Sequence, residues 1–227
     1  MNASVTPLRI SLPTGRTVSG ILQQPGHARA CFVFAHGAGA GMEHHFMSDL
    51  AAALGDNGIA TLRYQFPYME DASKRPDSPP VAHAAVRAAV EAASGSLPGL
   101  PLFAGGKSFG GRMTSQAQAV SALANVLGLI FVGFPLHTAG KPSRQRAEHL
   151  SHINVPMLFL QGTRDELADL ALMQTTALAL GKLARLHVVE GADHAFHVLV
   201  RSGRTDAQVI DELSTTIANW IESSIPA

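Results

Sequence analysis

The residues with the most specific chemistry in this chain form a Gly-x-Ser-x-Gly segment, in which Ser108 lies between Gly106 and Gly110. An apolar run precedes the segment and a helix-like stretch follows it. A serine on a sharp turn from strand to helix projects its hydroxyl out of the sheet, and small neighbours allow the backbone to make that turn. A plain turn explains most isolated matches to this pattern, because glycine and serine are common. Ser108 is therefore a candidate nucleophile that needs support from the rest of the chain.

Two later residues can supply the base and the acid that a serine nucleophile requires. Asp165 follows the apolar run 155–161, and His194 follows the next such run, 184–190. The order Ser, Asp, His, with each residue in the loop after a strand, is typical of one class of strand–turn–helix nucleophile sites. We therefore predict a catalytic triad of Ser108, Asp165 and His194, which attacks a carbonyl carbon and forms an acyl-enzyme.

Neighbouring acids and histidines are alternatives to two members of this triad. Glu166 and Asp169 are expected inside the helix that follows Asp165, and Asp169 is the alternative orienting acid. His197, three residues after His194, is the alternative base, although we expect it to pack against the protein or to face solvent. A position directly after the strand favours Asp165 and His194.

The negative oxygen of a tetrahedral intermediate needs preorganised N–H donors. One donor is expected to be the backbone amide of Phe109, the residue after the nucleophile. The other is assigned to the amide of Ala38, in the glycine-rich loop after the strand that ends at Ala35. Gly37 and Gly39 would let this backbone approach the substrate closely. Alone, the loop indicates only a turn before a helix; beside the Ser108 turn, it indicates an oxyanion hole.

Residues flanking these loops are expected to border the substrate. Lys107 and Arg112 flank Ser108 and would attract an anionic group, while packing and a solvated helix face are equally expected roles for them. Tyr68 is expected near the pocket, and Phe134 is expected mainly in the core. The predicted substrate-binding residues are Gly37, Gly39, Met42, Arg63, Tyr64 and Lys107.

Nucleotide and metal chemistry find little support. Gly106-Lys107-Ser108 resembles the end of a phosphate-binding loop, but that motif needs a glycine where this chain has Pro101. The segment 37–42 fails as a dinucleotide fingerprint, because its sixth residue is methionine. No carboxylate or cysteine grouping completes the histidine pairs of the sequence, so no metal and no other cofactor is expected.

Several segments together resemble a known family, the small α/β-hydrolases without a cap domain. These are bacterial proteins akin to dienelactone hydrolases, with eukaryotic relatives among testis-expressed proteins and chromatin-complex subunits. The resemblance implies an α/β-hydrolase fold and hydrolase activity, whereas dienelactone hydrolase activity proper is less expected, because that family has cysteine where this chain has Ser108. It extends from about residue 30 to the C-terminus, and the segments that carry it are 36–41, 62–70, 105–112, 161–165 and 191–196.

Composition agrees with a protein of this kind. Of 227 residues, 46% are hydrophobic and 15% are charged, which suits a parallel sheet that helices cover on both faces. With 17 basic and 17 acidic residues, the chain lacks the charge footprint of a nucleic-acid binder. No signal peptide or membrane span is evident, so a cytoplasmic protein is expected. The single Cys31 is expected to be an inert core residue. The alanine-rich surface leaves a homodimer open.

Apolar runs and helical periodicity predict alternating strands and helices, and hence a mostly parallel sheet in one domain over 1–227. Residues 5–12 and 16–23 are expected to form an N-terminal hairpin, and the short connection 133–143 leaves no room for a lid. Further strands are predicted over 30–35, 59–64, 101–105, 127–132, 156–161 and 184–190, and helices over 45–57, from 79 onwards, and over 110–121, 143–151, 166–180 and 206–223.

The sequence thus predicts a serine hydrolase that cleaves a small carboxylic ester, with a thioester or an amide as alternative bonds. The rival hypothesis is a non-catalytic interaction module with the same fold. The intact Ser108, Asp165 and His194 and the glycine-rich loop favour the enzyme, because a decayed enzyme would be expected to have lost at least one of them.

Overall fold

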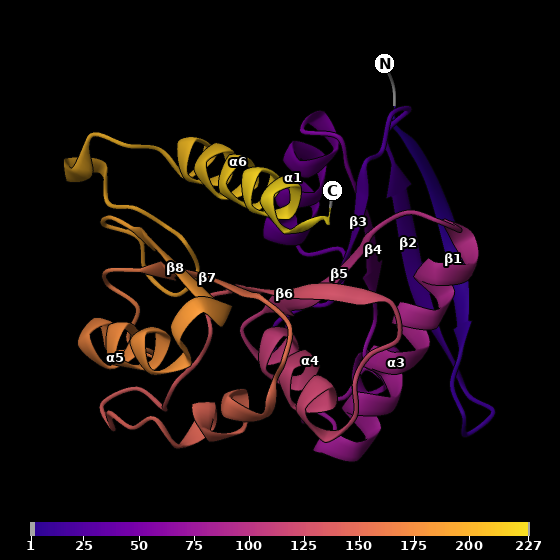
Figure 1. Cartoon of the computed structure of the whole chain (residues 1–227), viewed down its shortest axis with the longest axis horizontal. Coiled ribbons are helices and arrows are strands. Elements are labelled where there is room, and N and C mark those ends of the chain that lie inside the picture. Colours follow the sequence, from indigo (N-terminus) through magenta and orange to yellow (C-terminus); the bar gives the residue numbers. More distant parts are fainter. Residues whose placement is uncertain (1–2, 227) are drawn as a thin grey trace.

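A computed structural model describes residues 3–226, and its backbone is organised around one eight-stranded twisted sheet (Figure 1). The strand order is β1-β2-β4-β3-β5-β6-β7-β8. The first two strands form an antiparallel hairpin, β2 pairs antiparallel with β4, and all later pairs are parallel. The strands are β1 Ser4–Ser11, β2 Thr17–Gln24, β3 Ala30–Ala35, β4 Ile59–Tyr64, β5 Leu102–Lys107, β6 Val126–Val132, β7 Met157–Gly162 and β8 Ala184–Val189.

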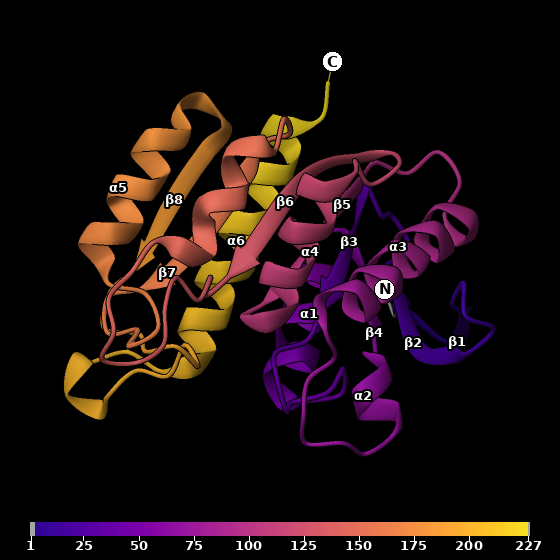
Figure 2. The ribbon, with the colours of Figure 1, turned by 90° about the horizontal axis from the view of Figure 1, so that it is seen from below.

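Helices cover both faces of the sheet. Figures 1 and 2 show α1 and α6 on one side and α3, α4 and α5 on the other. The α-helices are α1 His45–Asp56, α2 Pro67–Glu70, α3 Pro79–Ser96, α4 Phe109–Val120, α5 Leu170–Leu180 and α6 Asp206–Ser224. Three short 3₁₀ helices are η1 Gln145–His152, η2 Gly181–Leu183 and η3 Val200–Ser202. This arrangement confirms the predicted mostly parallel sheet with an N-terminal hairpin.

The central strands are mostly apolar because both of their faces are buried. Every residue of β3 is buried, and its side chains alternate between two core clusters. Phe32 and Phe34 pack on the α1 and α6 side, where Trp220 of α6 also lies. Cys31 and Val33 pack on the opposite side, together with the alanine-rich face of α3. Cys31 is thus a buried core residue, as predicted.

Some predicted elements need correction. The short helix α2 lies between the predicted strand 59–64 and the helix from 79, where no element was predicted, and the helix expected over 143–151 is the 3₁₀ helix η1. The helix predicted over 166–180 begins only at Leu170, because the Asp169 carboxylate accepts a hydrogen bond from the Leu172 amide and caps the N-terminus there. Glu166 and Asp169 therefore lie before the helix, not inside it.

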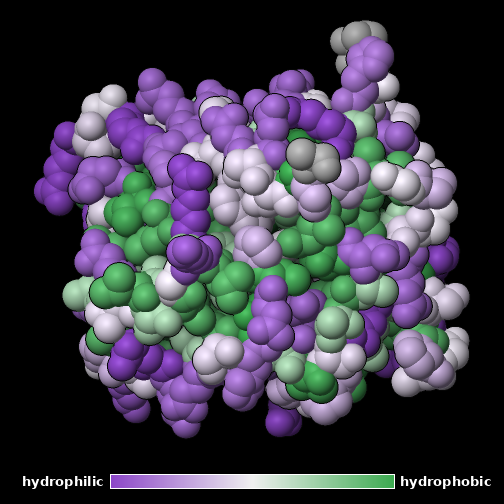
Figure 3. Space-filling view, in the orientation of Figure 1, coloured by the Kyte–Doolittle hydropathy of each residue, from purple (hydrophilic) through white to green (hydrophobic). Residues whose placement is uncertain are grey.

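The surface reflects the low charged fraction of the chain. Figure 3 shows hydrophobic residues in a band across the middle of the face seen in Figure 1, with hydrophilic residues mostly along its margins. Such a mixture is ordinary, because more than half of a typical protein surface is contributed by apolar atoms. Among the described residues, no helix has the length and apolar character that a membrane span would require.

Parallel strands bring their carboxyl ends to a common edge, and the loops that follow them meet there. The residues predicted as the triad and the oxyanion hole come from the segments directly after β3, β5, β7 and β8. The connection after β6, residues 133–144, contains neither helix nor strand, so no lid is inserted at this point. The fold therefore directs four loops toward one edge and leaves that edge without a covering domain.

Candidate active site

Ser108 occupies the sharp turn between β5 and α4, with φ of 49° and ψ of −111°. Few non-glycine residues adopt positive φ, and here the conformation aims the side chain out of the end of the strand. The turn also brings two backbone segments together. A Cβ atom on Gly106 would lie 2.4 Å from the Ala35 oxygen, and one on Gly110 would lie 2.6 Å from the same oxygen. These contacts explain why glycine is needed on both sides of the serine.

The strained turn predicts an effect on stability that is separate from chemistry. Ser108→Gly is expected to have a larger free energy of unfolding than Ser108→Ala, by about 1 kcal/mol, because glycine adopts positive φ without a Cβ clash. Chemical denaturation of the two variants measures this difference directly. Equal stability of the two would show that the turn is not strained at Ser108.

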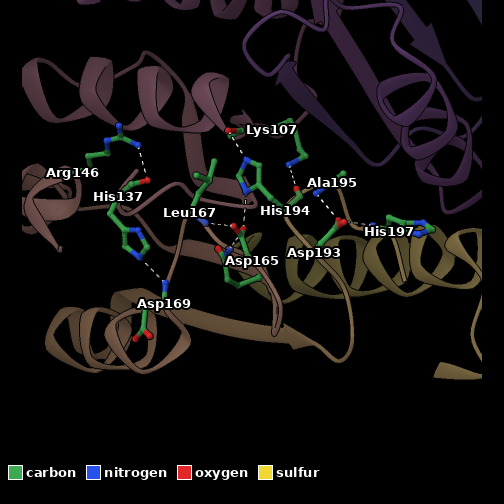
Figure 4. A network of polar contacts seen from close by, with 12 residues as sticks. Lys107, His137, Arg146, Asp165, Leu167, Asp169, Asp193, His194, Ala195 and His197 are labelled. Atoms are coloured by element: carbon green, nitrogen blue, oxygen red, sulfur yellow. Dashed lines mark hydrogen bonds and ion pairs between the residues drawn. The ribbon is translucent and has the colours of Figure 1, made fainter. Parts of the chain in front are cut away.

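The residues predicted as a triad form a chain of hydrogen-bonding distances in which His194 links Asp165 to Ser108. Figure 4 shows the contact between Asp165 and His194. The distance between His194 Nε2 and Ser108 Oγ is 2.8 Å, and that between His194 Nδ1 and Asp165 Oδ2 is 2.7 Å. A carboxylate can only accept, so Nδ1 carries the proton of the neutral ring and Nε2 is free to accept the serine proton. The arrangement can therefore activate a serine hydroxyl.

Asp165 is held by the end of β7 and the loop that follows it. Its carboxylate is buried and accepts hydrogen bonds from the Leu167 amide, at 2.8 Å, and from the Gln161 side chain. The two bonds fix the carboxylate in the orientation that meets His194. Gln161 was not identified from the sequence, although its place four residues before Asp165 at the end of a strand was visible there.

The alternative acid, Asp169, and the alternative base, His197, bond to residues outside the predicted triad. Asp169 caps α5, and its amide donates to His137 Nε2 at 2.8 Å. His197 is exposed, and its Nδ1 lies 2.8 Å from Asp206 at the start of α6. That ion pair raises the pKa of His197. The structure therefore brings only Asp165 and His194, and neither alternative, to Ser108.

The two amides predicted to form the oxyanion hole flank Ser108. Within residues 3–226, neither the Ala38 amide nor the Phe109 amide donates to a protein acceptor. By contrast, the neighbouring Gly39 amide donates to the Tyr68 hydroxyl at 2.9 Å. Ala38 lines the cavity beside Ser108. Neither amide is thus committed to a protein acceptor within the described residues.

His36 holds the loop that carries Ala38. Its Nδ1 lies 2.7 Å from the Gly37 oxygen, and its Nε2 lies 3.1 Å from the Phe66 amide. Because a carbonyl only accepts and an amide N–H only donates, Nδ1 carries the proton and Nε2 accepts. Burial lowers the pKa of His36 to about 4, so the ring stays neutral and keeps both bonds at physiological pH.

A cavity of about 370 Å³ opens beside Ser108 and His194. It contains the predicted Gly37, Ala38 and Lys107. Six residues that the sequence did not identify complete its lining, and four of them come from α1 or the loop before it: Ala40, His44, Phe46, Met47, Leu167 and Ala195. In the sequence, Phe46 and Met47 look like part of an ordinary apolar helix face. Their place in the helix directly after the glycine-rich loop was the one sequence feature that indicated a position beside the cavity.

Four residues predicted to bind substrate lie outside this lining: Gly39, Met42, Arg63 and Tyr64. Arg63 lies behind the loop, where its guanidinium donates to the Met42 oxygen at 3.2 Å and to Ser48 Oγ at 2.7 Å. Tyr64 is fully buried, and burial raises the pKa of its hydroxyl. The Arg63 side chain bonds to the Met42 backbone and the Tyr64 side chain is enclosed in the core, so neither lines the cavity.

Comparisons with known proteins concern nearly the whole chain. A family model described as an alpha/beta hydrolase domain matches residues 28–222. Dienelactone hydrolase from Anabaena variabilis is 18% identical with a TM-score of 0.80 over 100% of both chains. XC6422 from Xanthomonas campestris, a serine hydrolase without a lid, is 19% identical with a TM-score of 0.73 over 100% of this chain and 97% of its own. Est1E from Butyrivibrio proteoclasticus is 16% identical with a TM-score of 0.67 over 96% and 100%. At these identities the likeness to solved structures concerns the fold.

Proposed function

The chain belongs to the alpha/beta hydrolase family, and from that premise we propose that it is a serine hydrolase that cleaves a small carboxylic ester. The observation that carries the proposal is the continuous relay from Asp165 through His194 to Ser108, with distances of 2.7 and 2.8 Å, beside a largely apolar cavity. A thioester or an amide would react by the same steps.

In the first half of the reaction, Ser108 Oγ attacks the carbonyl carbon while His194 Nε2 removes its proton. Asp165 accepts the hydrogen bond from His194 Nδ1 and stabilises the imidazolium that forms. The carbonyl oxygen becomes negative and is bound by the amides of Ala38 and Phe109. His194 then returns the proton to the leaving alcohol, and the acyl group remains on Ser108.

In the second half, a water molecule replaces the alcohol. His194 removes a proton from the water, which attacks the acyl-enzyme, and the same two amides bind the second negative oxygen. Collapse of this intermediate releases the acid and restores the Ser108 hydroxyl. Each donor of an oxyanion hole contributes about 3–4 kcal/mol to such a reaction.

The cavity favours a neutral substrate with a small acyl group. Its volume of about 370 Å³ is near the lower end of the range for small-molecule sites. Ala38, Phe46, Met47 and Leu167 make much of the lining apolar. With no lid after β6, the protein has little further surface with which to enclose a long chain.

Labelling with a fluorophosphonate probe tests the proposal. We expect the folded protein to be labelled at the tryptic peptide of residues 108–112 and the heat-denatured protein not to be labelled, because only the assembled relay activates the serine. A folded protein that resists the probe would contradict the proposal and favour the non-catalytic interaction module.

The chain-length dependence of ester hydrolysis tests the substrate class. We expect kcat/KM for p-nitrophenyl acetate and butyrate to exceed that for p-nitrophenyl decanoate by at least about tenfold, because a cavity that cannot hold the extra methylenes gains nothing from them. The measurement compares initial rates below the solubility limit of each ester. Faster turnover of the decanoate would exclude a small acyl pocket.

A further inference from the structure

Lys107 lies directly before the proposed nucleophile, and its side chain crosses the site toward the loop of His194. Its Nζ donates to the backbone oxygen of His194 at 2.5 Å (Figure 4). The ammonium also lies over two aromatic rings, 5.3 Å from the centre of Phe196 and 5.8 Å from the centre of Phe46. The two rings are stacked at 5.7 Å. The charge is therefore held in a defined place between β5, α1 and the loop after β8.

Two glycines lie against this side chain, one at the ammonium and one at the stem. A Cβ atom on Gly133, after β6, would lie 3.1 Å from Lys107 Nζ, and one on Gly37 would lie 3.5 Å from Lys107 Cγ. The stem thus packs against the oxyanion loop while the ammonium contacts the His194 loop. One residue at the end of β5 consequently touches two of the other loops that the proposed reaction requires.

We propose that Lys107 is a positioning residue that fixes the backbone of His194 against the nucleophile turn. The inference rests on the proposed serine hydrolase function. His194 lies in a loop, and the contacts of its ring with Ser108 and Asp165 do not fix its backbone. The bond from Lys107 to the His194 oxygen and the contact with Phe196, two residues later, anchor that backbone from the side of β5.

The charges around the ammonium agree with this role. Burial lowers the pKa of Lys107 to about 8, while the carboxylates of Asp165 and Asp193 act in the opposite direction. His44, the residue before α1, also lies near this charge: burial lowers the pKa of His44, and the charges of His45 and Lys107 lower it further. The lysine is thus mainly protonated at neutral pH and loses its charge as the pH rises through about 8.

The variant Lys107→Met tests the proposal, with Lys182→Met as the matched control on an exposed lysine of η2. We expect kcat for a neutral short-chain ester to fall by about 10- to 100-fold with KM changed less than about twofold, because a misplaced base slows the chemical step and not substrate binding. Wild-type kcat should decline above a pH of about 8, and Lys107→Met should lack this decline. Lys182→Met should behave as wild type.

The thermal stability of Lys107→Met distinguishes a positioning role of Lys107 from a packing role. The folded protein holds the pKa of Lys107 below that of an exposed lysine, so the protonated ammonium disfavours folding at pH values below about 8. Removal of this charge should therefore leave the thermal unfolding midpoint of Lys107→Met unchanged or raised while kcat falls. A lower midpoint together with lost activity would overturn the proposal in favour of a packing role. A change confined to KM for anionic esters would overturn it in favour of substrate binding.

Hydrogen exchange tests the anchor without any catalytic assay. We expect amides of residues 192–198 to exchange several-fold faster in Lys107→Met than in wild type, while amides of α5 are unaffected. Unchanged exchange in this loop would overturn the proposal. Hydrogen exchange and fluorophosphonate labelling test different claims. A wild-type protein that resists fluorophosphonate would refute the proposed hydrolase function. Hydrogen exchange of that same protein would still show whether Lys107 holds the His194 loop.

Discussion

Replacing Ser108 by alanine is expected to abolish fluorophosphonate labelling and to lower kcat for a short-chain ester by on the order of 10⁶-fold. The methyl group of alanine cannot attack a carbonyl carbon. Among the described residues, Ser108 supplies the one hydroxyl within hydrogen-bonding distance of His194 Nε2. Because triad residues act as a unit, His194→Ala should lose about as much as Ser108→Ala, and the double variant little more. Initial rates with high enzyme concentration measure the residual activity.

A second serine–histidine pair provides the matched control: Ser115 lies in α4, the helix that follows Ser108, and His149 lies in η1. Ser115 Oγ lies 2.8 Å from His149 Nε2, the same separation as in the proposed site. Ser115 is buried. Burial and the neighbouring Arg112 lower the pKa of His149, and among the described residues no carboxylate bonds to its ring. Ser115→Ala should therefore keep both labelling and kcat. Loss of labelling in Ser115→Ala, or its survival in Ser108→Ala, would contradict the assignment of the nucleophile.

Asp165→Asn is expected to lower kcat by about 10⁴-fold with little change in the fold. An amide nitrogen at the Oδ2 position would donate a proton toward His194 Nδ1, so the ring would have to place its own proton on Nε2. A protonated Nε2 cannot accept the Ser108 proton. The substitution keeps the size of the side chain, and the Leu167 amide can still donate to its remaining oxygen. Steady-state kinetics with circular dichroism as a check of folding measure the effect.

The same substitution at Asp169 separates the two candidate acids. Asn caps a helix about as well as Asp, so Asp169→Asn should preserve the bond from the Leu172 amide and the start of α5. We expect kcat within about threefold of wild type, because Asp169 does not contact His194. If Asp169→Asn were as damaging as Asp165→Asn, the orienting acid would have been assigned to the wrong residue.

The two predictions concern one consequence of the fold. Ser108 and Asp165 are separated by strands β6 and β7 along the chain, and yet both lie at the carboxyl edge of the parallel sheet. The relay needs no covering domain, since the loops after β3, β5, β7 and β8 meet at this edge. An open site of this kind accommodates small acyl groups and gives little enclosure to long ones.

Local chain properties were sufficient to predict the elements and the order of the proposed triad. The Ser108 turn needs glycines at 106 and 110 because a Cβ atom would meet the backbone of β3, and that steric requirement appears in the sequence itself. The apolar run before Asp165 forms the fully buried strand β7, whereas the segment before His194 forms the edge strand β8, in which Val189 alone is buried, and both residues follow strand ends. Parallel pairing then implies a common edge.

Only the tertiary structure decided which neighbouring side chains face the cavity. Arg63 and Tyr64 end a strand at the correct edge, but Arg63 bonds to the Met42 backbone and Tyr64 is buried in the core, while Phe46 and Met47 line the cavity from a helix that resembles ordinary core. The role inferred for Lys107 depends on a bond to a residue 87 positions away. Local sequence patterns predict strands, turns and helices, whereas the direction of a side chain depends on the packing of segments that are distant in the chain.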